Sequence, residues 1–424
     1  MMLKNVVKEL GIPINDAGDK MELYTNARNF FIRSFKKKYS NFFQSPSVLP
    51  SVISQRSGNQ SDLEHSVYQR SDYTPISLET SLNGYFPDLG SVKSTTLMFS
   101  SGMAAVSSLV YFLYGKKGVS KIDIGKNSYF ETKWLIEDYR RVFWFNEYAL
   151  DIEASCSCIW TEYPINCTQP GLYPFSSQMN LSRLFKKSIE MASSTRRQTY
   201  LVIDYTLGFL PFDVALYLDK LPENLTVFLV TSLQKHRGYG FDLTNAGAVT
   251  IYSHHLKEDR EYLDRVRAIT GSLVTQETVW LMPQINPTLI NKLVHDSGQN
   301  AHDIFYKLKD VSSQVRVDYA DSKDFYTSFI YLTISPEMMK RSVLVPYYSD
   351  LLVKEIIQTA KRKKTVIVQG TSFGFPFTRI FKNSERYENT NSLRVAIGYD
   401  EEMTQGVAES LEEGINNFVN KYGE

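Results

Sequence analysis

The sequence predicts an α/β fold in which a mostly parallel central sheet is followed by a smaller C-terminal α+β domain. Between residues 77 and 252, short apolar runs alternate with segments of helical periodicity, as in a doubly wound sheet. Several of these runs are continuously apolar, which is typical of parallel strands buried on both faces. After residue 282, further strand-like runs and amphipathic helices form a second group. We therefore expect a large α/β domain and a smaller one.

Size and composition suit a large globular protein. The chain has 424 residues, of which 43% are hydrophobic and 22% charged, enough for two or three domains with a substantial core. Its formal net charge of +1 argues against general attraction to nucleic acid or to an anionic membrane. No apolar run approaches the roughly 18 residues of a membrane span, and the N-terminus lacks the apolar core of a signal peptide.

The three cysteines, Cys156, Cys158 and Cys167, are odd in number and close in sequence. This pattern suits reduced thiols in a cytoplasmic protein. The trio could bind a metal, but no histidine lies nearby in the sequence, so we expect no metal site.

The first segment, residues 1–65, is expected to form a helical arm and a connection. Apolar residues recur at helical spacing over 19–44, and the three lysines at 36–38 fit the solvated face of that helix. Residues 45–62 are rich in serine and proline and are expected to be irregular.

The large domain is expected to span residues 66–255. Its candidate strands are 97–101, 121–125, 156–162, 199–205, 225–232 and 246–252. Helical stretches lie between them at 102–115 and 182–194. Residues 254–282 are expected to form helices that leave this domain.

The smaller C-terminal domain is expected to span residues 256–424. Its candidate strands are 329–335, 365–370 and 393–398, and its candidate helices are 349–362 and 402–422. The alternation of strands and helices predicts a mixed α+β structure.

Several polar residues follow the predicted strands of the large domain, where open α/β sheets bind their ligands. Gly102 and Met103 lie at a strand-to-helix turn, where backbone N–H groups can bind a phosphate. Asp204 ends one apolar run, and Lys235 follows another, three residues after Ser232. Taken singly, these residues could equally form a tight turn, cap a loop or carry a solvated charge.

An amine, a carboxylate and a phosphate site together are what pyridoxal phosphate requires of a protein. The lysine forms a Schiff base with the cofactor, the anion keeps the pyridine nitrogen protonated, and the turn anchors the phosphate.

Nine segments, in order along the chain, resemble the pyridoxal-phosphate enzymes of cysteine and methionine metabolism. This family includes cystathionine γ-synthase, the cystathionine lyases and methionine γ-lyase, which share fold type I, the aspartate-aminotransferase-like fold. The segments are YQRSDYTPISLE at 68–79, FSSGMAAVSSL at 99–109, SYFE at 128–131, TEYPIN at 161–166, VIDYT at 202–206, TSLQK at 231–235, ITGSLVTQETVWLM at 269–282, QGTSFG at 369–374 and SLRVAIGYDE at 392–401.

The resemblance implies roles around the cofactor. Lys235 would hold it and then move protons, so its pKa must lie below the ordinary value of about 10.4. Asp204 would pair with the pyridine nitrogen, Asn166 with the phenolic oxygen, and Tyr129 would stack on the ring. The remaining cofactor-binding residues implied are Gly102, Met103, Ser232, Thr206 and Arg70.

The resemblance also implies how the substrate is bound and how subunits share the active site. Arg394 would hold the substrate α-carboxylate through a bidentate guanidinium pair, with Ser372 beside it. Tyr68 and Arg70 would reach in from a neighbouring subunit, so a homodimer or homotetramer with shared active sites is expected. Tyr129 or Tyr68 would assist the leaving group.

The sequence departs from the family pattern at several positions. Gln234 replaces a threonine before the lysine, and the basic pair His236–Arg237 follows it, either binding phosphate or facing solvent. Phe130 and Glu131 stand where the family usually has small residues after the tyrosine. These changes indicate a divergent member with a reshaped substrate pocket, in specialised amino-acid metabolism.

The expected reaction is elimination or replacement at the β- or γ-carbon of an amino acid. An aminotransferase, or another reaction at the α-carbon, is the alternative on the same scaffold. A non-catalytic binding module is the alternative from another class, and the presence of both Lys235 and Asp204 argues against it.

Overall fold

The protein is described from a computed structural model. The described residues are 2–13, 19–42, 76–86, 88–116, 119–125, 128–144, 156–163, 181–195, 197–208, 215–218, 221–283, 285–321, 326–340, 348–382 and 392–423.

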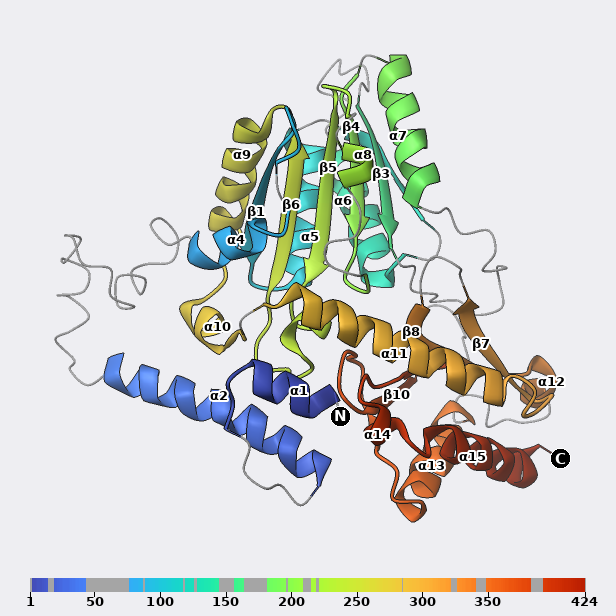
Figure 1. Ribbon diagram of the computed structural model, residues 1–424. Helices are drawn as coiled ribbons and strands as arrows, with labels where there is room; N and C mark the ends of the chain where they lie inside the picture. The colour runs from blue at the N-terminus through green and yellow to red at the C-terminus, as the bar shows by residue number, and fades with distance from the viewer. Residues whose placement is uncertain are drawn as a thin grey trace.

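A six-stranded sheet forms the centre of the first part of the chain (Figure 1). In spatial order its strands are β1 (Lys93–Phe99), β6 (Gly247–Ser253), β5 (Leu225–Ser232), β4 (Thr199–Asp204), β3 (Cys156–Glu162) and β2 (Val119–Ile124). Strands β5, β4, β3 and β2 are parallel, and β6 runs antiparallel to both of its neighbours. The predicted mostly parallel sheet is therefore confirmed, and each predicted strand overlaps an observed one.

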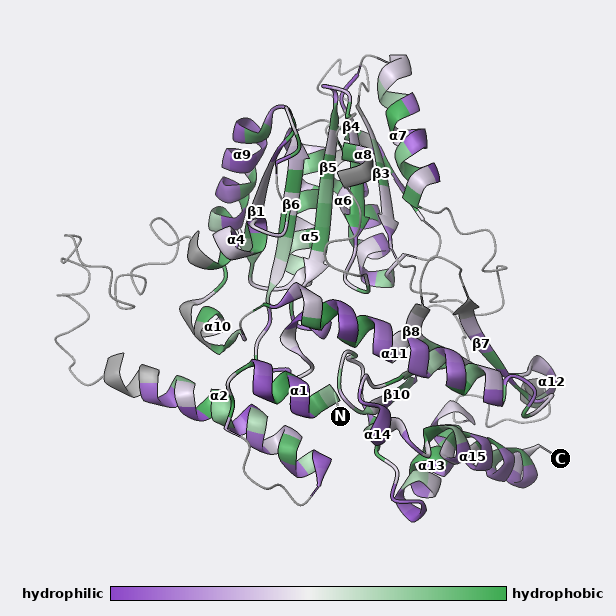
Figure 2. Cartoon of the chain, viewed as in Figure 1, coloured by the Kyte–Doolittle hydropathy of each residue, from purple (hydrophilic) through white to green (hydrophobic). Residues whose placement is uncertain are grey.

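Helices cover both faces of this sheet, which explains its apolar strands. On one face α5 (Gly102–Tyr111), α6 (Phe130–Trp144) and α9 (Leu256–Ile269) share a core cluster with the strands. On the other face α7 (Leu181–Thr195) and the short α8 (Ala215–Leu218) pack similarly. Successive residues of β4 join opposite clusters, because strand side chains alternate between faces. Figure 2 shows the central strands mostly in the hydrophobic colour.

Helix α9 stays with the large sheet. Residues 254–282 were expected to leave the domain, yet Leu256 and Leu263 of α9 pack in the same cluster as the strands. The predicted domain limits at 65 and 255 remain predictions, and α9 lies after the second limit although it packs on the large sheet.

A five-stranded sheet forms the second part of the chain. Its order is β7 (Val315–Asp321), β8 (Tyr326–Ile334), β11 (Ser392–Ala396), β10 (Thr378–Lys382) and β9 (Ile367–Gln369), antiparallel except for the parallel β9–β10 pair. One face packs on α11 (Pro287–Leu308), α13 (Tyr348–Arg362) and α15 (Val407–Tyr422). Four short helices, outside the N-terminal arm, complete the described α-helices: α4 (Ile76–Asn83), α10 (Gln276–Leu281), α12 (Pro336–Lys340) and α14 (Glu401–Thr404). Strands β7 and β10 were not predicted, since polar residues interrupt both.

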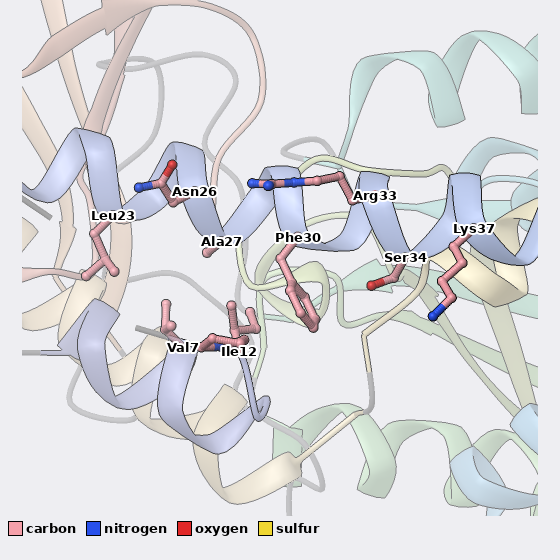
Figure 3. Close-up of a pocket in the computed structure, with 10 residues that line it drawn as sticks. Val7, Ile12, Leu23, Asn26, Ala27, Phe30, Arg33, Ser34 and Lys37 are labelled. Atoms are coloured by element: carbon pink, nitrogen blue, oxygen red, sulfur yellow. The ribbon is translucent and has the colours of Figure 1, made fainter. Parts of the chain in front are cut away.

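The N-terminal helix α2 (Lys20–Phe42) matches the predicted arm, and a further helix, α1 (Met2–Glu9), precedes it. Both are anchored to the rest of the chain through Asp400, which accepts hydrogen bonds from the Leu3 N–H (2.8 Å) and from Lys20 Nζ (2.7 Å). A cavity of about 340 Å³ lies between α1 and α2, with side chains of both helices facing it (Figure 3). None of the described helices is both long and apolar enough to cross a membrane.

Candidate active site

A cavity of about 540 Å³ lies where the β4 and β5 strands end, beside the start of α5 and against the β11 sheet. The structure brings most of the predicted site residues to its wall: Gly102, Met103, Tyr129, Asp204, Thr206, Ser232, Lys235 and Arg394. Ser372 is not among the lining residues, but its Oγ atom accepts a hydrogen bond from Lys235, which is. The other three predicted site residues, Tyr68, Arg70 and Asn166, lie outside the described residues.

Lys235 lies in the turn after β5, immediately before the short 3₁₀ helix His236–Gly238. Its Nζ atom donates a hydrogen bond to Ser372 Oγ over 2.9 Å and lies 5.5 Å from the centre of the Phe373 ring. Burial lowers the pKa of the Lys235 amine to about 8, because removing water disfavours the charged form. An amine with this pKa is a competent base near neutral pH.

Asp204 ends β4, beside Val230 of β5. Its Oδ1 atom accepts a hydrogen bond from the Thr206 N–H over 3.0 Å. Burial raises the pKa of Asp204, and this rise is opposed by hydrogen bonds from Thr206 and by the charge of Arg237. A buried carboxylate in this state is stabilised further by a cationic partner entering the cavity.

The positive charge of Arg237 favours the ionised form of the Asp204 carboxylate. The arginine side chain is fully buried, and its guanidinium donates to the carbonyl oxygens of Thr206 (3.1 Å) and Tyr205 (3.3 Å) and lies over the Tyr205 ring. His236 is also buried, within 3.4 Å of Ser297 Oγ. The expectation that this basic pair binds phosphate or faces solvent is therefore wrong, because both side chains point into the interior.

The start of α5 forms a narrow turn against β5 and β6. Ser101 caps the helix by accepting a hydrogen bond from the Ala104 N–H over 3.0 Å. A Cβ atom on Gly102 would lie 3.0 Å from Ser232 Cβ, so a larger residue here would require the neighbouring chain to shift by a few tenths of an ångström. The N–H groups of Gly102 and Met103 belong to the first turn, where a helix offers no acceptor of its own. Together with the Ser232 hydroxyl they provide donors for an anion, whereas the Thr206 hydroxyl, predicted to bind the cofactor, donates to Asp204 and accepts from the Ser232 N–H over 3.0 Å.

Tyr129 also lines the cavity and lies just before α6. Its backbone N–H donates to Glu162, a buried carboxylate at the end of β3 that lies beside Asp204 in the sheet. Its hydroxyl has the Glu131 carboxylate as its side-chain partner, and burial raises the pKa of the phenol well above its ordinary value. The phenol is therefore neutral, and its single proton is donated to Glu131.

Arg394 comes from β11, whose side chains alternate between two faces. Leu393 and Val395 point into the core, and Arg394 points toward the cavity. Its guanidinium lies 5.0 Å from the centre of the Phe329 ring and donates to the Thr371 carbonyl. These contacts orient it in a half-buried position, where burial lowers its pKa somewhat.

Sequence reasoning did not assign roles to Glu162 and Arg237. Glu162 could have been found as a carboxylate at the end of a predicted strand, the same signal that identified Asp204. The sequence carries no comparable signal for Arg237, because a buried arginine that binds backbone carbonyls looks like a loop charge.

The donor set fits pyridoxal phosphate. Lys235 supplies an amine, Asp204 an anion for a protonated ring nitrogen, and Tyr129 an aromatic face. The phosphate donors are the N–H groups of Gly102 and Met103 and the Ser232 hydroxyl. Gln234, in place of the threonine of the family pattern, binds Asp242 instead.

Solved structures with the same fold place these features in a known context. Two are of CalE6 from Micromonospora echinospora: the apo form, described as a methionine gamma lyase (TM-score 0.55, 16% identity, 82% of this chain and 87% of that chain), and a form described as a cystathione gamma lyase (0.53, 14%, 85% and 95%). A third is cystathionine gamma-lyase from Lactobacillus plantarum complexed with L-serine (0.55, 16%, 87% and 92%). The chain therefore has the fold-type-I architecture predicted from its sequence.

No protein-family model matches the sequence. The bifunctional enzyme flvA of Aspergillus flavus is 26% identical over 207 residues, which are 46% of this chain. The matched region spans only 24% of the length of that enzyme.

Proposed function

We propose that the protein is a pyridoxal-phosphate-dependent enzyme that eliminates or replaces a group at the β- or γ-carbon of an amino acid. The observation that carries the proposal is the meeting of three groups in one cavity: the Lys235 amine, the buried Asp204 carboxylate and the Arg394 guanidinium. The likeness to gamma lyases supports it, since those enzymes share the fold.

Arg394 binds the substrate α-carboxylate in this proposal. A guanidinium can form two parallel hydrogen bonds with a carboxylate, and its contacts with Phe329 and Thr371 fix its direction in advance. The substrate is thereby held with its α-carbon toward the Lys235 side of the cavity.

Lys235 moves the protons. When bound, pyridoxal phosphate stores the electron pair left by a broken bond at the α-carbon. The Lys235 Nζ atom accepts the proton from the α-carbon, and for chemistry at the γ-carbon it also removes one from the β-carbon. The lowered pKa makes the neutral amine accessible near pH 8.

Tyr129 assists the departing group. Its neutral phenol donates to Glu131 in the free protein, and with substrate bound it redirects that hydrogen bond to a leaving atom at the β- or γ-carbon. Glu162 holds the backbone of this tyrosine in place, which limits its movement during the reaction.

The test of this proposal is product analysis by mass spectrometry with β- and γ-substituted amino acids and added pyridoxal phosphate. Elimination releases ammonia and a keto acid, and replacement yields a new amino acid in the presence of a nucleophile. Exchange of the amino group with a keto acid would indicate an aminotransferase. Cofactor binding without turnover of any substrate would indicate a binding module.

A second readout tests the cofactor site directly. Borohydride reduction should fix pyridoxal phosphate to Lys235, as found by peptide mapping, and Lys235→Ala should abolish the adduct. An adduct on another lysine would contradict the assignment.

We also propose a homo-oligomer with shared sites, from the resemblance of the segment that holds Tyr68 and Arg70. Mixing inactive Lys235→Ala with inactive Arg70→Ala should restore activity, because one site in each hybrid dimer is then complete. Absence of rescue despite subunit exchange would contradict shared sites. The cytoplasmic location expected from the cysteines stays a prediction.

A further inference from the structure

The proposed function gives a role to most, but not all, of the charged side chains that line the cavity. Among the described lining residues the cations are Lys235 and Arg394, and the anions are Glu131, Glu162 and Asp204. In the proposed function Lys235 and Arg394 act at the α-carbon end of the substrate, and Asp204 faces the cofactor. Glu162 binds the Tyr129 backbone. The carboxylate of Glu131 accepts the Tyr129 hydroxyl but has no assigned role toward the substrate or the cofactor.

Glu131 is placed to act on the substrate. It lies in the first turn of α6, where the helix dipole favours a negative charge, and it is half-buried in the cavity wall. It is the side-chain partner of the Tyr129 hydroxyl, and its charge acts on the Lys235 amine across the cavity. Within the described part of the chain it forms no ion pair.

We propose that Glu131 sets the charge preference of the substrate pocket. The pocket accepts an amino acid whose side chain or leaving group is neutral or cationic at its far end, and it rejects one that ends in a carboxylate or phosphate. This inference rests on the proposed function, because that function directs the α-carboxylate to Arg394.

The physical reason is like-charge repulsion in a partly enclosed site. A second anion on the substrate would face Glu131, while both described cations of the cavity are engaged at the α-carbon end. Juxtaposed like charges in a partly desolvated site are strongly unfavourable, and the effective dielectric constant there is far below that of bulk water.

The test compares two amino acids with chains of six carbons, L-norleucine and L-2-aminoadipate, which end in a methyl group and a carboxylate. Their dissociation constants are measured by calorimetry and by the visible absorbance of the protein loaded with pyridoxal phosphate. We expect 2-aminoadipate to bind at least about tenfold more weakly than norleucine. Glu131→Gln and Glu131→Ala should reduce that ratio to about threefold or less.

The matched control is Glu137→Gln, which removes an exposed carboxylate from the same helix but outside the cavity wall. It should leave the ratio unchanged. Equal binding of the two amino acids by the unaltered protein, or an unchanged ratio in both Glu131 variants, would overturn the inference.

A turnover arm separates this inference from the proposed function. O-acetyl-L-homoserine and O-succinyl-L-homoserine differ in whether the leaving group carries a carboxylate, and the acetyl ester should be preferred in a Glu131-dependent manner. Turnover of both esters at equal rates would refute the charge preference and leave the proposed reaction standing. Rejection of 2-aminoadipate without any turnover would refute the reaction and leave the charge preference standing.

Discussion

The Nζ atom of Lys235 lies 2.9 Å from the Oγ atom of Ser372, a residue 137 positions away in the sequence. Lys235 follows strand β5 of the large sheet, and Ser372 belongs to the loop after β9 of the small one. The position of the amine is therefore fixed by two sheets at once. This arrangement gives the amine a polar partner in a setting that otherwise removes it from water.

The titration of Lys235 should be visible in the cofactor-free protein. Burial lowers the pKa of this amine to about 8, so it should react with acylating reagents with a midpoint near pH 8, as measured by quantitative peptide mapping. Lys235→Met provides the blank, and the exposed Lys307 reports the behaviour of the reagent in the same digest. A midpoint near 10.5, the ordinary value, would show that burial has no effect.

The same shift predicts how stability depends on pH. Folding lowers the pKa of Lys235, so between about pH 8 and 10.5 the unfolded chain binds more protons at this residue than the folded protein does. The contribution of Lys235 therefore makes the cofactor-free protein less stable as the pH falls through that window. Lys235→Met should raise the melting temperature more at pH 7 than at pH 10.5, and an equal change at both would contradict this.

Gly374 holds the loop of Ser372 against the loop of Lys235. Its φ angle is +84°, and a Cβ atom there would lie 2.7 Å from the His236 nitrogen and 2.9 Å from the Lys235 carbonyl carbon. Gly374→Ala should lower the free energy of unfolding by more than the roughly 1–2 kcal/mol of left-handed backbone strain, because the two loops must also separate. It should weaken pyridoxal phosphate binding through displacement of Lys235.

The control for this substitution is Gly90→Ala. Gly90 has a φ angle of +59°, with no atom within 4 Å of an added Cβ, so only the backbone strain applies. Urea unfolding and cofactor titration of both variants separate strain from steric conflict. Equal losses of stability, with normal cofactor affinity in Gly374→Ala, would show that close packing of the loops is unimportant.

Arg394→Ala should impair turnover while the cofactor stays bound. Loss of one partner of a charge-assisted pair inside a site costs about 2–5 kcal/mol, or roughly 30- to 4,000-fold in kcat/KM. Arg394→Lys should recover little, because an ammonium group cannot form the bidentate pair. The control is Arg316→Ala on the exposed side of strand β7. Near-normal kcat/KM in Arg394→Ala would show that another group binds the carboxylate.

Much of the site was predictable because its residues follow apolar strands. Asp204 and Lys235 each come at the end of a continuous hydrophobic run, and parallel neighbouring strands bring such ends together. Arg394 lies on another sheet, and only the family resemblance placed it in the site. Its orientation follows from alternation along β11, which buries Leu393 and Val395 on the opposite face.

Some features could not be predicted because they depend on hydrogen bonds between residues that are far apart in the sequence. Arg237 is fully buried because the carbonyls of Tyr205 and Thr206 accept its hydrogen bonds, and the local sequence contains no trace of these partners. Strand β7, VRVDYAD, alternates apolar and polar residues and so contains no continuous apolar run, the feature by which most of the other strands were predicted.

A buried ion pair joins α4 and α9 behind strand β1. Arg267 NH1 binds Glu79 and donates to the Met98 carbonyl over 2.9 Å, while Glu79 accepts the Met98 N–H over 2.8 Å. Their side chains are 0% and 6% exposed. Glu79→Gln should therefore lower the free energy of unfolding by about 3 kcal/mol, the lower end of the range for breaking a buried pair, since Arg267 keeps the half-exposed Asp264 as its remaining carboxylate partner.

The same arginine provides its own control. Arg267 Nε also binds Asp264 over 2.6 Å, and the side chain of Asp264 is 42% exposed. Asp264→Asn should cost about 1 kcal/mol or less, because the asparagine keeps an acceptor oxygen for Arg267 Nε and the half-exposed carboxylate is already screened by water. Urea denaturation of the two variants compares them under identical conditions. If Glu79→Gln is no more destabilising than Asp264→Asn, the buried pair does not hold α4 to the sheet, and the anchoring of the segment before β1 must come from its apolar contacts, Leu82 foremost.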